Sequence, residues 1–402
     1  MPEFSELEVP ALSLVVLIGV SDDLRSDFTG RHFAPEEVQT TLEGAAHRLE
    51  NGLLTVLNAP HLRAAQRAGA VGLAREHNVQ AVGIVLDPEL HGPDERARMA
   101  ALRSELGGHD SPGLRAEGFR TAYRLRSRAE LDGASVRRVP LKPDRRELHG
   151  PFDLVGDVHG CLPELLSLLS KLGYRTGQHL EVKPPPGRTL IFLGDLTDRG
   201  PDSAGVLRLV MGMLAAGTAL CVQGNHDAKL LRALQGHAVK ITHGLEVTLA
   251  QLAHEPPEFL SAVQAFLAGL PHHLLLDDGR LVAAHAGLPA SFQGRHSGRV
   301  WSFALYGDVE KQGKDENGMP IRRDWAAEYH GSALVVYGHT PVQQPRWKNH
   351  TVNLDTGCVF GGQLSALRYP ELRTVSVPAE AIYREAGRAS VSVPPEERQH
   401  GA

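Results

Sequence analysis

Apolar residues in the first 150 positions occur as short continuous runs, separated by segments with helical spacing. The runs at 12–19, 53–57 and 81–87 are typical of strands buried on both faces of a sheet. The alanine-rich segment 64–76, between the second and third runs, has the apolar spacing of a helix. Strands that alternate with helices predict an α/β domain with a parallel sheet.

After residue 107 this pattern breaks down into a stretch rich in Gly, Pro and Arg. Residues 115–146 contain ten Lys or Arg against four Asp or Glu, in a chain whose formal net charge is −5. We interpret this segment as a solvated connector between domains, with a nucleic-acid contact surface as the alternative. The negative net charge excludes a protein that coats nucleic acid or anionic membrane by bulk positive charge.

From residue 152 onward the pattern predicts a second α/β domain. Continuous apolar runs predict strands at 152–156, 189–194, 218–222, 281–284 and 334–337, and further strands near Val352 and Leu364. Helical spacing occurs at 163–172, 203–214 and 228–234. We therefore expect domains at 1–148 and 149–385, followed by a disordered tail at 386–402.

Each of the first five strands of the second domain ends in a polar cluster. In chain order the clusters read Gly-Asp157-Val-His159-Gly, Gly-Asp195-Leu-Thr-Asp198-Arg199-Gly, Gly-Asn225-His226-Asp227, His285-Ala-Gly and Gly-His339-Thr-Pro. A single such cluster is more often a capped loop or a hydrogen-bonded histidine, but chance does not explain five in order. Because open α/β sheets place their sites at the carboxyl ends of strands, we expect the clusters to converge on one site.

The residue types in these clusters are those of a two-metal hydrolytic site. Carboxylates, amide oxygens and imidazoles suit hard or borderline divalent cations. Two cations about 3.5–4 Å apart need one shared carboxylate and can clamp a phosphoryl group for attack by an activated water. We assign Asp195 as the bridge, Asp157 and His159 to one metal, and Asn225, His285 and His339 to the other.

These motifs, over residues 153 to about 357, resemble the signature of the calcineurin-like metallophosphoesterases, which reads GDxHG, GDxxDRG, GNHD/E, a histidine-glycine strand end and GHTP. The resemblance implies a four-layer α/β/β/α sandwich and two divalent metal ions, most simply Mn²⁺, with Ni²⁺, Fe or Zn²⁺ as alternatives. It also implies a metal-activated hydroxide as nucleophile. By position, Arg199 matches the phosphate-binding arginine, and His226 paired with Asp198 matches the leaving-group acid. A guanidinium fork suits two phosphate oxygens, and a histidine held by a carboxylate can donate a proton near neutral pH. We interpret Asp227 as structural.

Four further stretches narrow the resemblance to the phosphatase module of bacterial polynucleotide kinase-phosphatases. They are His149-Gly-Pro-Phe-Asp153, Trp301-Ser-Phe-Ala-Leu-Tyr-Gly307, Trp325-Ala-Ala-Glu-Tyr329 and Asn353-Leu-Asp-Thr-Gly-Cys-Val-Phe-Gly-Gly362. The resemblance implies RNA repair, with 2′-phosphate, 3′-phosphate or 2′,3′-cyclic phosphate RNA ends or related nucleotides as substrates. The alternatives are a bis(5′-nucleosyl)-tetraphosphatase, which hydrolyses diadenosine tetraphosphate, a serine/threonine protein phosphatase and, least favoured, a non-catalytic scaffold.

In that bacterial family a P-loop kinase precedes the phosphatase and a ligase module follows it. A Walker A loop needs G-x-x-x-x-G-K-[ST], but the matching residues read Gly19-Val-Ser-Asp-Asp-Leu24-Arg25-Ser26. Leucine replaces the second glycine, arginine replaces the lysine, and two aspartates would place like charge beside a phosphate. We therefore predict a degenerate, P-loop kinase-like first domain, a pseudokinase without kinase activity, and expect any ligase or kinase to be a separate partner.

The histidine and cysteine contents differ sharply. The chain has 21 histidines but only three cysteines, Cys161, Cys221 and Cys358, with no C-x-x-C pair. This spacing predicts neither a disulfide framework nor a thiolate zinc site. No apolar run reaches the length of a membrane span, so we expect a cytoplasmic protein without a membrane partner.

Overall fold

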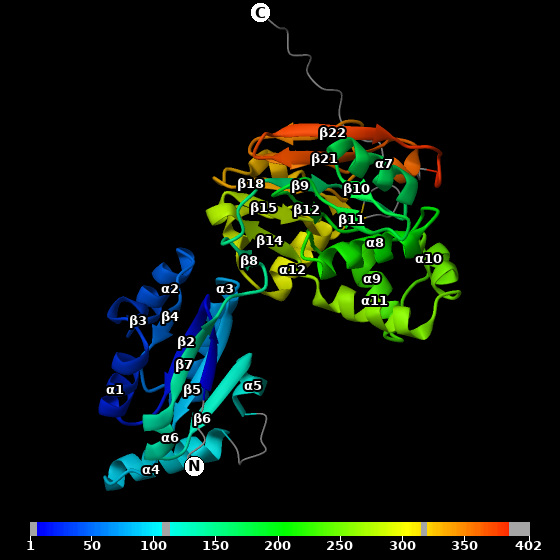
Figure 1. Cartoon of the computed structure of the whole chain (residues 1–402). Coiled ribbons are helices and arrows are strands. Elements are labelled where there is room, and N and C mark those ends of the chain that lie inside the picture. Colours follow the sequence, from blue (N-terminus) through cyan, green and yellow to red (C-terminus); the bar gives the residue numbers. More distant parts are fainter. Residues whose placement is uncertain (1–5, 107–112, 315–319, 386–402) are drawn as a thin grey trace, which may run out of the picture. The chain divides into compact units, whose positions relative to one another are not determined.

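The structure is a computed structural model that describes residues 6–106, 113–314 and 320–385 (Figure 1). The described chain divides into two compact units. Unit 1 comprises Met1–Asp144 and Gly294–Val300, and unit 2 comprises Arg145–Gln293 and Trp301–Ala402. The sequence had placed residues 294–300 in the second domain, whereas the structure groups them with unit 1. The tail at 386–402, predicted to be disordered, lies outside the described residues.

Unit 1 is built on a parallel sheet in the strand order β3-β4-β2-β5-β6. Its strands are β2 (Ser13–Ile18), β3 (Val38–Gln39), β4 (Thr55–Leu57), β5 (Gln80–Leu86) and β6 (Thr121–Leu125), while β1 (Glu6–Pro10) and β7 (Ser135–Val139) form a separate parallel pair. Its helices are α1 (Asp22–His32), α2 (Leu42–Glu50), α3 (Ala64–Glu76), α4 (Pro93–Leu106), α5 (Gly113–Glu117) and α6 (Arg128–Gly133).

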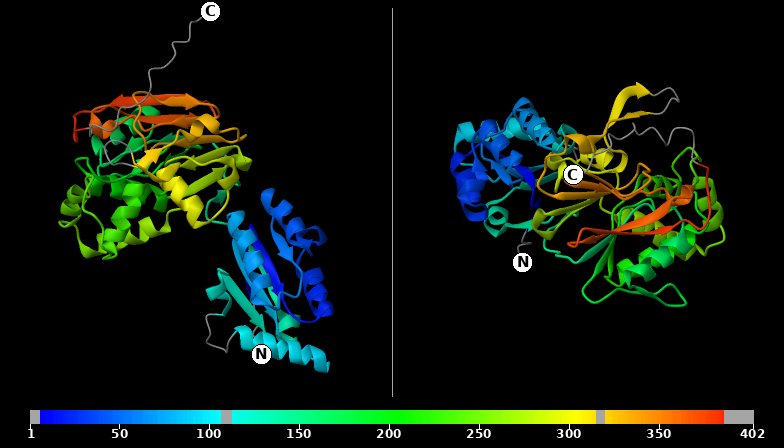
Figure 2. Two further views of the ribbon diagram at one scale, coloured as in Figure 1. Left: turned by 180° about the vertical axis from the view of Figure 1, so that it is seen from behind. Right: turned by 90° about the horizontal axis from the view of Figure 1, so that it is seen from above.

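The central strand β2 is buried on both faces, which explains its continuous apolar run. Leu14 and Val16 pack into a core shared with α2, α3 and α4. Val15 and Leu17 face the opposite core, which α1 and α6 help to close. Figure 2 shows the elements of this unit, coloured blue to cyan, around its sheet. The predicted parallel α/β class is confirmed for this part of the chain.

The side chain of Arg25 fills the loop that follows β2. Arg25 in α1 is 4% exposed, and its Nε donates to Oδ1 of Asn58 at 3.2 Å. Its other nitrogens donate to the carbonyl of Gly19 and pair with the carboxylate of Asp22. The guanidinium is therefore neutralised and hydrogen-bonded within the loop where a Walker A lysine would meet phosphate.

The basic segment 115–146 is not a connector, and that prediction is wrong. β6 extends the main sheet by pairing with β5, and β7 pairs with β1. These edge strands carry few buried apolar residues, so their pattern resembled a loop. Several of the arginines are in ion pairs, among them Arg124 with the buried Asp87, Arg128 with Asp132, Arg137 with Glu6 and Glu8, and Arg138 with Glu37.

Unit 2 contains two larger sheets. One has the order β13-β12-β9-β21-β22, with β9 (Phe152–Val155), β12 (Thr189–Phe192), β13 (Ala219–Cys221), β21 (Gln363–Tyr369) and β22 (Arg373–Pro378). The other has the order β19-β20-β18-β15-β14-β8, with β8 (Asp144–Arg145), β14 (His273–Leu276), β15 (Leu281–Ala284), β18 (Leu334–Tyr337), β19 (Arg346–Lys348) and β20 (Thr351–Asn353). Two short pairs complete the strands: β10 (Arg175–Thr176) with β11 (Val182–Lys183), and β16 (Val309–Lys314) with β17 (Pro320–Arg322).

The two sheets of unit 2 pack face to face. Residues of both sheets, such as Leu154 and Ile191 from one and Leu281 and Val336 from the other, form a single core cluster. Helices pack on the outer face of the first sheet: α7 (Leu162–Leu172), α8 (Ser203–Ala215), α9 (Asn225–Leu234), α10 (Leu245–Leu252) and α11 (Pro257–Gly269). Figure 1 shows α8 to α11 together in green.

The second sheet is covered through aromatic contacts. Because Val336 points into the inter-sheet core, its neighbour Tyr337 points outward. Trp325 contacts Tyr337 there, with ring centroids 5.0 Å apart, and Phe303 of α12 (Gly298–Tyr306) contacts Trp325 in turn. This arrangement of helices around two sheets confirms the predicted α/β sandwich. No helix among the described residues is long and apolar enough to cross a membrane.

Candidate active site and metal centre

The strand ends of both sheets in unit 2 bring the predicted polar residues together. Five of them, His159, Asp195, Asp198, Arg199 and His339, have backbone φ between 45° and 76°, a region that such side chains rarely adopt. Local backbone strain of this kind gathers at functional sites, where the surrounding structure fixes it.

Glycines beside these residues allow the close approach. A Cβ on Gly338 would lie 2.0 Å from Oδ1 of Asp157, and one on Gly224 would lie 2.2 Å from the backbone nitrogen of Asp195. Side chains at either position would push the carboxylates out of place, so the glycines are a steric requirement of the site.

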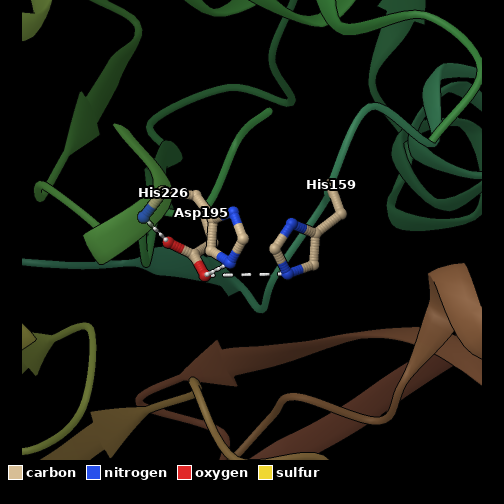
Figure 3. A group of neighbouring side chains, drawn as sticks. All are labelled: His159, Asp195 and His226. Carbon is tan, nitrogen blue, oxygen red and sulfur yellow. Dashed lines mark hydrogen bonds and ion pairs between the residues drawn. The ribbon is translucent and has the colours of Figure 1, made fainter. Parts of the chain in front are cut away.

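Around Asp195, the first group consists of that residue, His159 and His226 (Figure 3). Nε2 of His159 lies 3.6 Å and Nε2 of His226 lies 4.0 Å from Oδ2 of Asp195. The backbone N–H of His226 donates to the other carboxylate oxygen at 2.9 Å, which fixes the orientation of the carboxylate. The sequence predicted His159 and Asp195 together, but placed His226 in a different role.

On the other side of Asp195 lies a second group with His285, His339 and Asn225. Nδ1 of His285 donates to the carbonyl of Leu193 at 3.0 Å, which leaves a lone pair on Nε2. That Nε2 lies 2.9 Å from Oδ1 of Asn225, 3.0 Å from Nδ1 of His339 and 3.4 Å from Oδ1 of Asp195. Nitrogen and oxygen atoms of four residues, each from a different segment of the chain, converge here, an arrangement that a divalent cation would stabilise.

The orientation of His159 fits the same interpretation. Its Nδ1 donates to the carbonyl of Thr197 at 2.8 Å, so its Nε2 lone pair points toward the carboxylate of Asp195. A backbone carbonyl that fixes the tautomer of an imidazole is the usual outer partner of a histidine metal ligand. The donor set and the tautomers of His159 and His285 therefore fit divalent cations on both sides of Asp195.

The backbone of His339 holds the carboxylate of Asp157 in position. The N–H of His339 donates to both carboxylate oxygens of Asp157, at 3.2 Å each. Asp157 is 4% exposed and its pKa is raised well above the usual range by burial, and then by the negative charges of Asp355 and Asp195.

Two other buried carboxyl groups at the site are similarly perturbed. Burial raises the pKa of Asp195 to about 7, even though the His226 N–H and the Arg199 guanidinium both oppose the rise. Burial also raises the pKa of Asp355 to about 7. Buried carboxylates gathered in this way favour a bound cation, which would supply the missing positive charge.

The site histidines are held neutral. Burial lowers the pKa of His285 to about 4. Burial, followed by the charge of Arg199, lowers the pKa values of His159 and His226 well below the usual range. Neutral imidazole is the form that binds a metal.

Asp198 and His226 form a buried pair. Oδ2 of Asp198 lies 2.6 Å from Nδ1 of His226, and Oδ1 accepts a hydrogen bond from Thr248 at 2.6 Å. Burial raises the pKa of Asp198 to about 6. Asp227 is also fully buried, but it accepts hydrogen bonds from the backbone N–H groups of Leu196 and Gly224, which agrees with a structural role.

Arg199 links the two imidazoles of the first group. Its guanidinium donates to Nε2 of His159 at 2.6 Å and to Nε2 of His226 at 2.8 Å. The ring of Phe360 lies beneath the guanidinium, with its centroid 5.4 Å from the central carbon. The donors of Arg199 thus point at the atoms where a phosphoryl group would enter the site.

The motifs did not identify two residues that the structure places at the site. Asp355 follows β20 and lies beside Asp157, and the sequence had shown it only as part of a longer resemblance. Arg322, an exposed residue at the end of β17, donates to Nε2 of His339. The sequence signals for these two residues were an aspartate directly after a buried strand and a pair of consecutive arginines in a polar insertion. Both patterns are common at positions that have no functional role.

Comparison with known proteins is consistent with this geometry. The model of the calcineurin-like phosphoesterase family matches residues 150–350. An asymmetrical bis(5′-nucleosyl)-tetraphosphatase PrpE from Anoxybacillus flavithermus is 47% identical over 236 residues, 58% of this chain and 96% of that protein. The protein of the same description from Bacillus subtilis is 47% identical over 239 residues, 58% of this chain and 97% of its own length. A solved protein serine/threonine phosphatase from Saccharomyces cerevisiae is 16% identical with a TM-score of 0.42, covering 59% of this chain and 83% of that one.

Proposed function

Because this chain belongs to the calcineurin-like phosphoesterase family, we propose that it hydrolyses bis(5′-nucleosyl) tetraphosphates asymmetrically, giving a nucleoside triphosphate and a nucleoside monophosphate. The chain is a metal-dependent phosphoesterase. Relatives of this description, matched over nearly their whole length, support the substrate class. The observation that carries the proposal is the presence of two arginines, Arg199 and Arg322, at one cluster of carboxylates and imidazoles.

We assign Asp157, His159 and Asp195 to one divalent cation, and Asp195, Asn225, His285 and His339 to the other, with Mn²⁺ as the first candidate. Two such cations supply positive charge to the phosphoryl oxygens and lower the pKa of bound water. Asp195 holds the central position in this assignment because its two oxygens face the two groups.

The two arginines suit a substrate with several phosphates. A tetraphosphate bridge carries a negative charge on each phosphate, and a guanidinium presents a planar fork of donors to such oxygens. Arg199 reaches the His159 side of the cluster and Arg322 reaches the His339 side, so the two guanidiniums can bind different phosphates of one chain.

His226 is suited to protonate the leaving group. Asp198 holds its Nδ1, and Nε2 faces the guanidinium of Arg199. Arg199 helps to depress the pKa of His226, so a phosphate that neutralises Arg199 raises it. Substrate binding would then favour the protonated ring that a leaving phosphate oxygen needs.

The basic segment of unit 1 no longer supports the alternative of RNA-end repair. In the basic segment 115–146, the alternative nucleic-acid contact surface, several arginines are in ion pairs with acidic residues. We also propose that unit 1 is a pseudokinase, because the Arg25 side chain fills the loop after β2 where a Walker A lysine would meet phosphate. The full chain should then transfer no phosphate from ATP to 5′-hydroxyl RNA, and measurable transfer would refute that assignment.

Product analysis tests the proposal. The full chain, supplied with Mn²⁺ and diadenosine tetraphosphate, should give ATP and AMP in equal amounts by chromatography. Two molecules of ADP would indicate symmetrical cleavage and would overturn the asymmetrical assignment. Arg322→Ala should raise KM for the tetraphosphate more than for p-nitrophenyl phosphate, because the small ester has no second phosphate that Arg322 could bind.

A further inference from the structure

Two of the three cysteines meet behind the catalytic loops. Cys161 comes two residues after His159, at the residue just before α7, and Cys358 comes three residues after Asp355. Their sulfur atoms and a carboxylate oxygen of Glu164 all lie within 4.8 Å of one another. The three residues are buried, with 0%, 2% and 1% of their surfaces exposed.

The carboxylate of Glu164 is only half satisfied. Its Oε1 accepts a hydrogen bond from the backbone N–H of Glu380 at 2.8 Å. Its Oε2 is buried without a hydrogen-bond partner in the described part of the chain. The pKa of the nearby Tyr383 hydroxyl is raised by burial, then by a hydrogen bond to this carboxylate and by the negative charge of the carboxylate. An unpaired carboxylate oxygen inside a protein is costly, because burial removes its hydration.

We propose that Cys161, Glu164 and Cys358 bind a soft divalent cation such as Zn²⁺, at a third metal site outside the catalytic centre. Two thiolates and a carboxylate are a ligand set that soft or borderline cations prefer, whereas Mn²⁺ and Mg²⁺ favour oxygen and nitrogen donors. The N-terminus of α7 adds its partial positive charge to a negatively charged ligand set. The cation supplies the missing partner of Oε2.

The site joins the two loops that carry catalytic residues. Cys161 shares a loop with Asp157 and His159, and Cys358 shares one with Asp355. These loops come from opposite ends of unit 2 in sequence, after β9 and β20. A cation at this position fixes one loop against the other and stabilises both in the conformation that the catalytic centre needs.

Cadmium binding to the full chain tests the proposal, because cadmium–thiolate bonds give an ultraviolet charge-transfer band. The protein is first saturated with Mn²⁺ under reducing conditions, and then titrated with Cd²⁺. Cadmium that displaces Mn²⁺ from imidazole and carboxylate ligands gives no such band. We expect one equivalent of Cd²⁺ to produce the band, Cys358→Ser to weaken or abolish it, and Glu164→Gln to weaken binding about tenfold or more.

Cys221→Ser is the matched control, since Cys221 is equally buried but lies outside the cluster, on β13. This variant should keep the whole band. Circular dichroism checks that each variant is folded, and Glu164→Gln tests the site if a cysteine variant unfolds. The absence of a band in the wild type, a band that Cys358→Ser leaves unchanged, or one that Cys221→Ser removes would overturn the proposal.

Discussion

Nδ1 of His226 lies 2.6 Å from Oδ2 of Asp198, and both side chains are buried. The carboxylate fixes the ring so that Nε2 faces the site. If His226 protonates the leaving group, His226→Ala should slow hydrolysis of an alkyl phosphate about a hundredfold or more, and that of p-nitrophenyl phosphate much less. Steady-state kinetics on the two substrates makes the comparison. Equal losses on both would contradict the acid role.

Asp195 is the carboxylate shared by both proposed cations. Removing metals with a chelator should abolish turnover of p-nitrophenyl phosphate, and adding Mn²⁺ should restore it. Asp195→Ala should prevent this restoration, because its oxygens face both ligand groups. Asp278→Ala, which removes an exposed carboxylate elsewhere in unit 2, should recover fully. Wild-type recovery by the Asp195 variant would show that the ligand assignment is wrong.

Asp355 lies beside Asp157 and adds a negative charge to the site. Asp355→Asn keeps a similar shape but removes that charge. The concentration of Mn²⁺ that gives half-maximal activity should rise about tenfold or more. A metal titration of activity measures this requirement. An unchanged requirement with lower maximal activity would instead point to a role in positioning the loop.

In unit 1, a buried arginine is held mainly by one carboxylate. Arg67 is fully buried, and its guanidinium makes two hydrogen bonds of 2.7 Å with the carboxylate of Glu117. Glu117→Ala leaves this charge with Glu105 as its carboxylate partner, 3.5 Å away, and should destabilise unit 1 by about 2 kcal/mol. Faster hydrogen exchange in β2 and β5 would report the change, while phosphatase activity should persist.

The control for that prediction is an exposed pair in the same unit. Asp132→Ala removes a partner of Arg128 at the surface, where an ion pair contributes at most about 1 kcal/mol. Its exchange rates should stay close to those of the wild type. If both variants behave alike, the buried pair is not a special source of stability.

The strands that carry the site could be predicted because they are buried on both faces. β15 and β18 occur where their continuous apolar runs predicted, and α3 has the predicted bounds. The edge strands β6 and β7 could not be predicted from their own pattern, since their stability comes from pairing with β5 and β1. β22 was missed for the same reason, because it is an edge strand that pairs only with β21.

The local motifs indicated one convergent site, and the structure brings their residues together. They did not show contacts between residues far apart in sequence. Arg322 and His339 meet only through the fold, as do Cys161 and Cys358. The spacing of the cysteines argued against a thiolate site, because sequence spacing detects metal sites only when their ligands lie close together along the chain.

The substrate class is tested most directly by measuring kcat/KM in parallel for diadenosine tetraphosphate, 3′-phosphorylated RNA, a 2′,3′-cyclic nucleotide and a phosphoserine peptide. The full chain is assayed with saturating Mn²⁺ in each case. The account predicts that the value for diadenosine tetraphosphate exceeds each of the others about tenfold or more. A higher value for 3′-phosphorylated RNA, the 2′,3′-cyclic nucleotide or the phosphopeptide would contradict it.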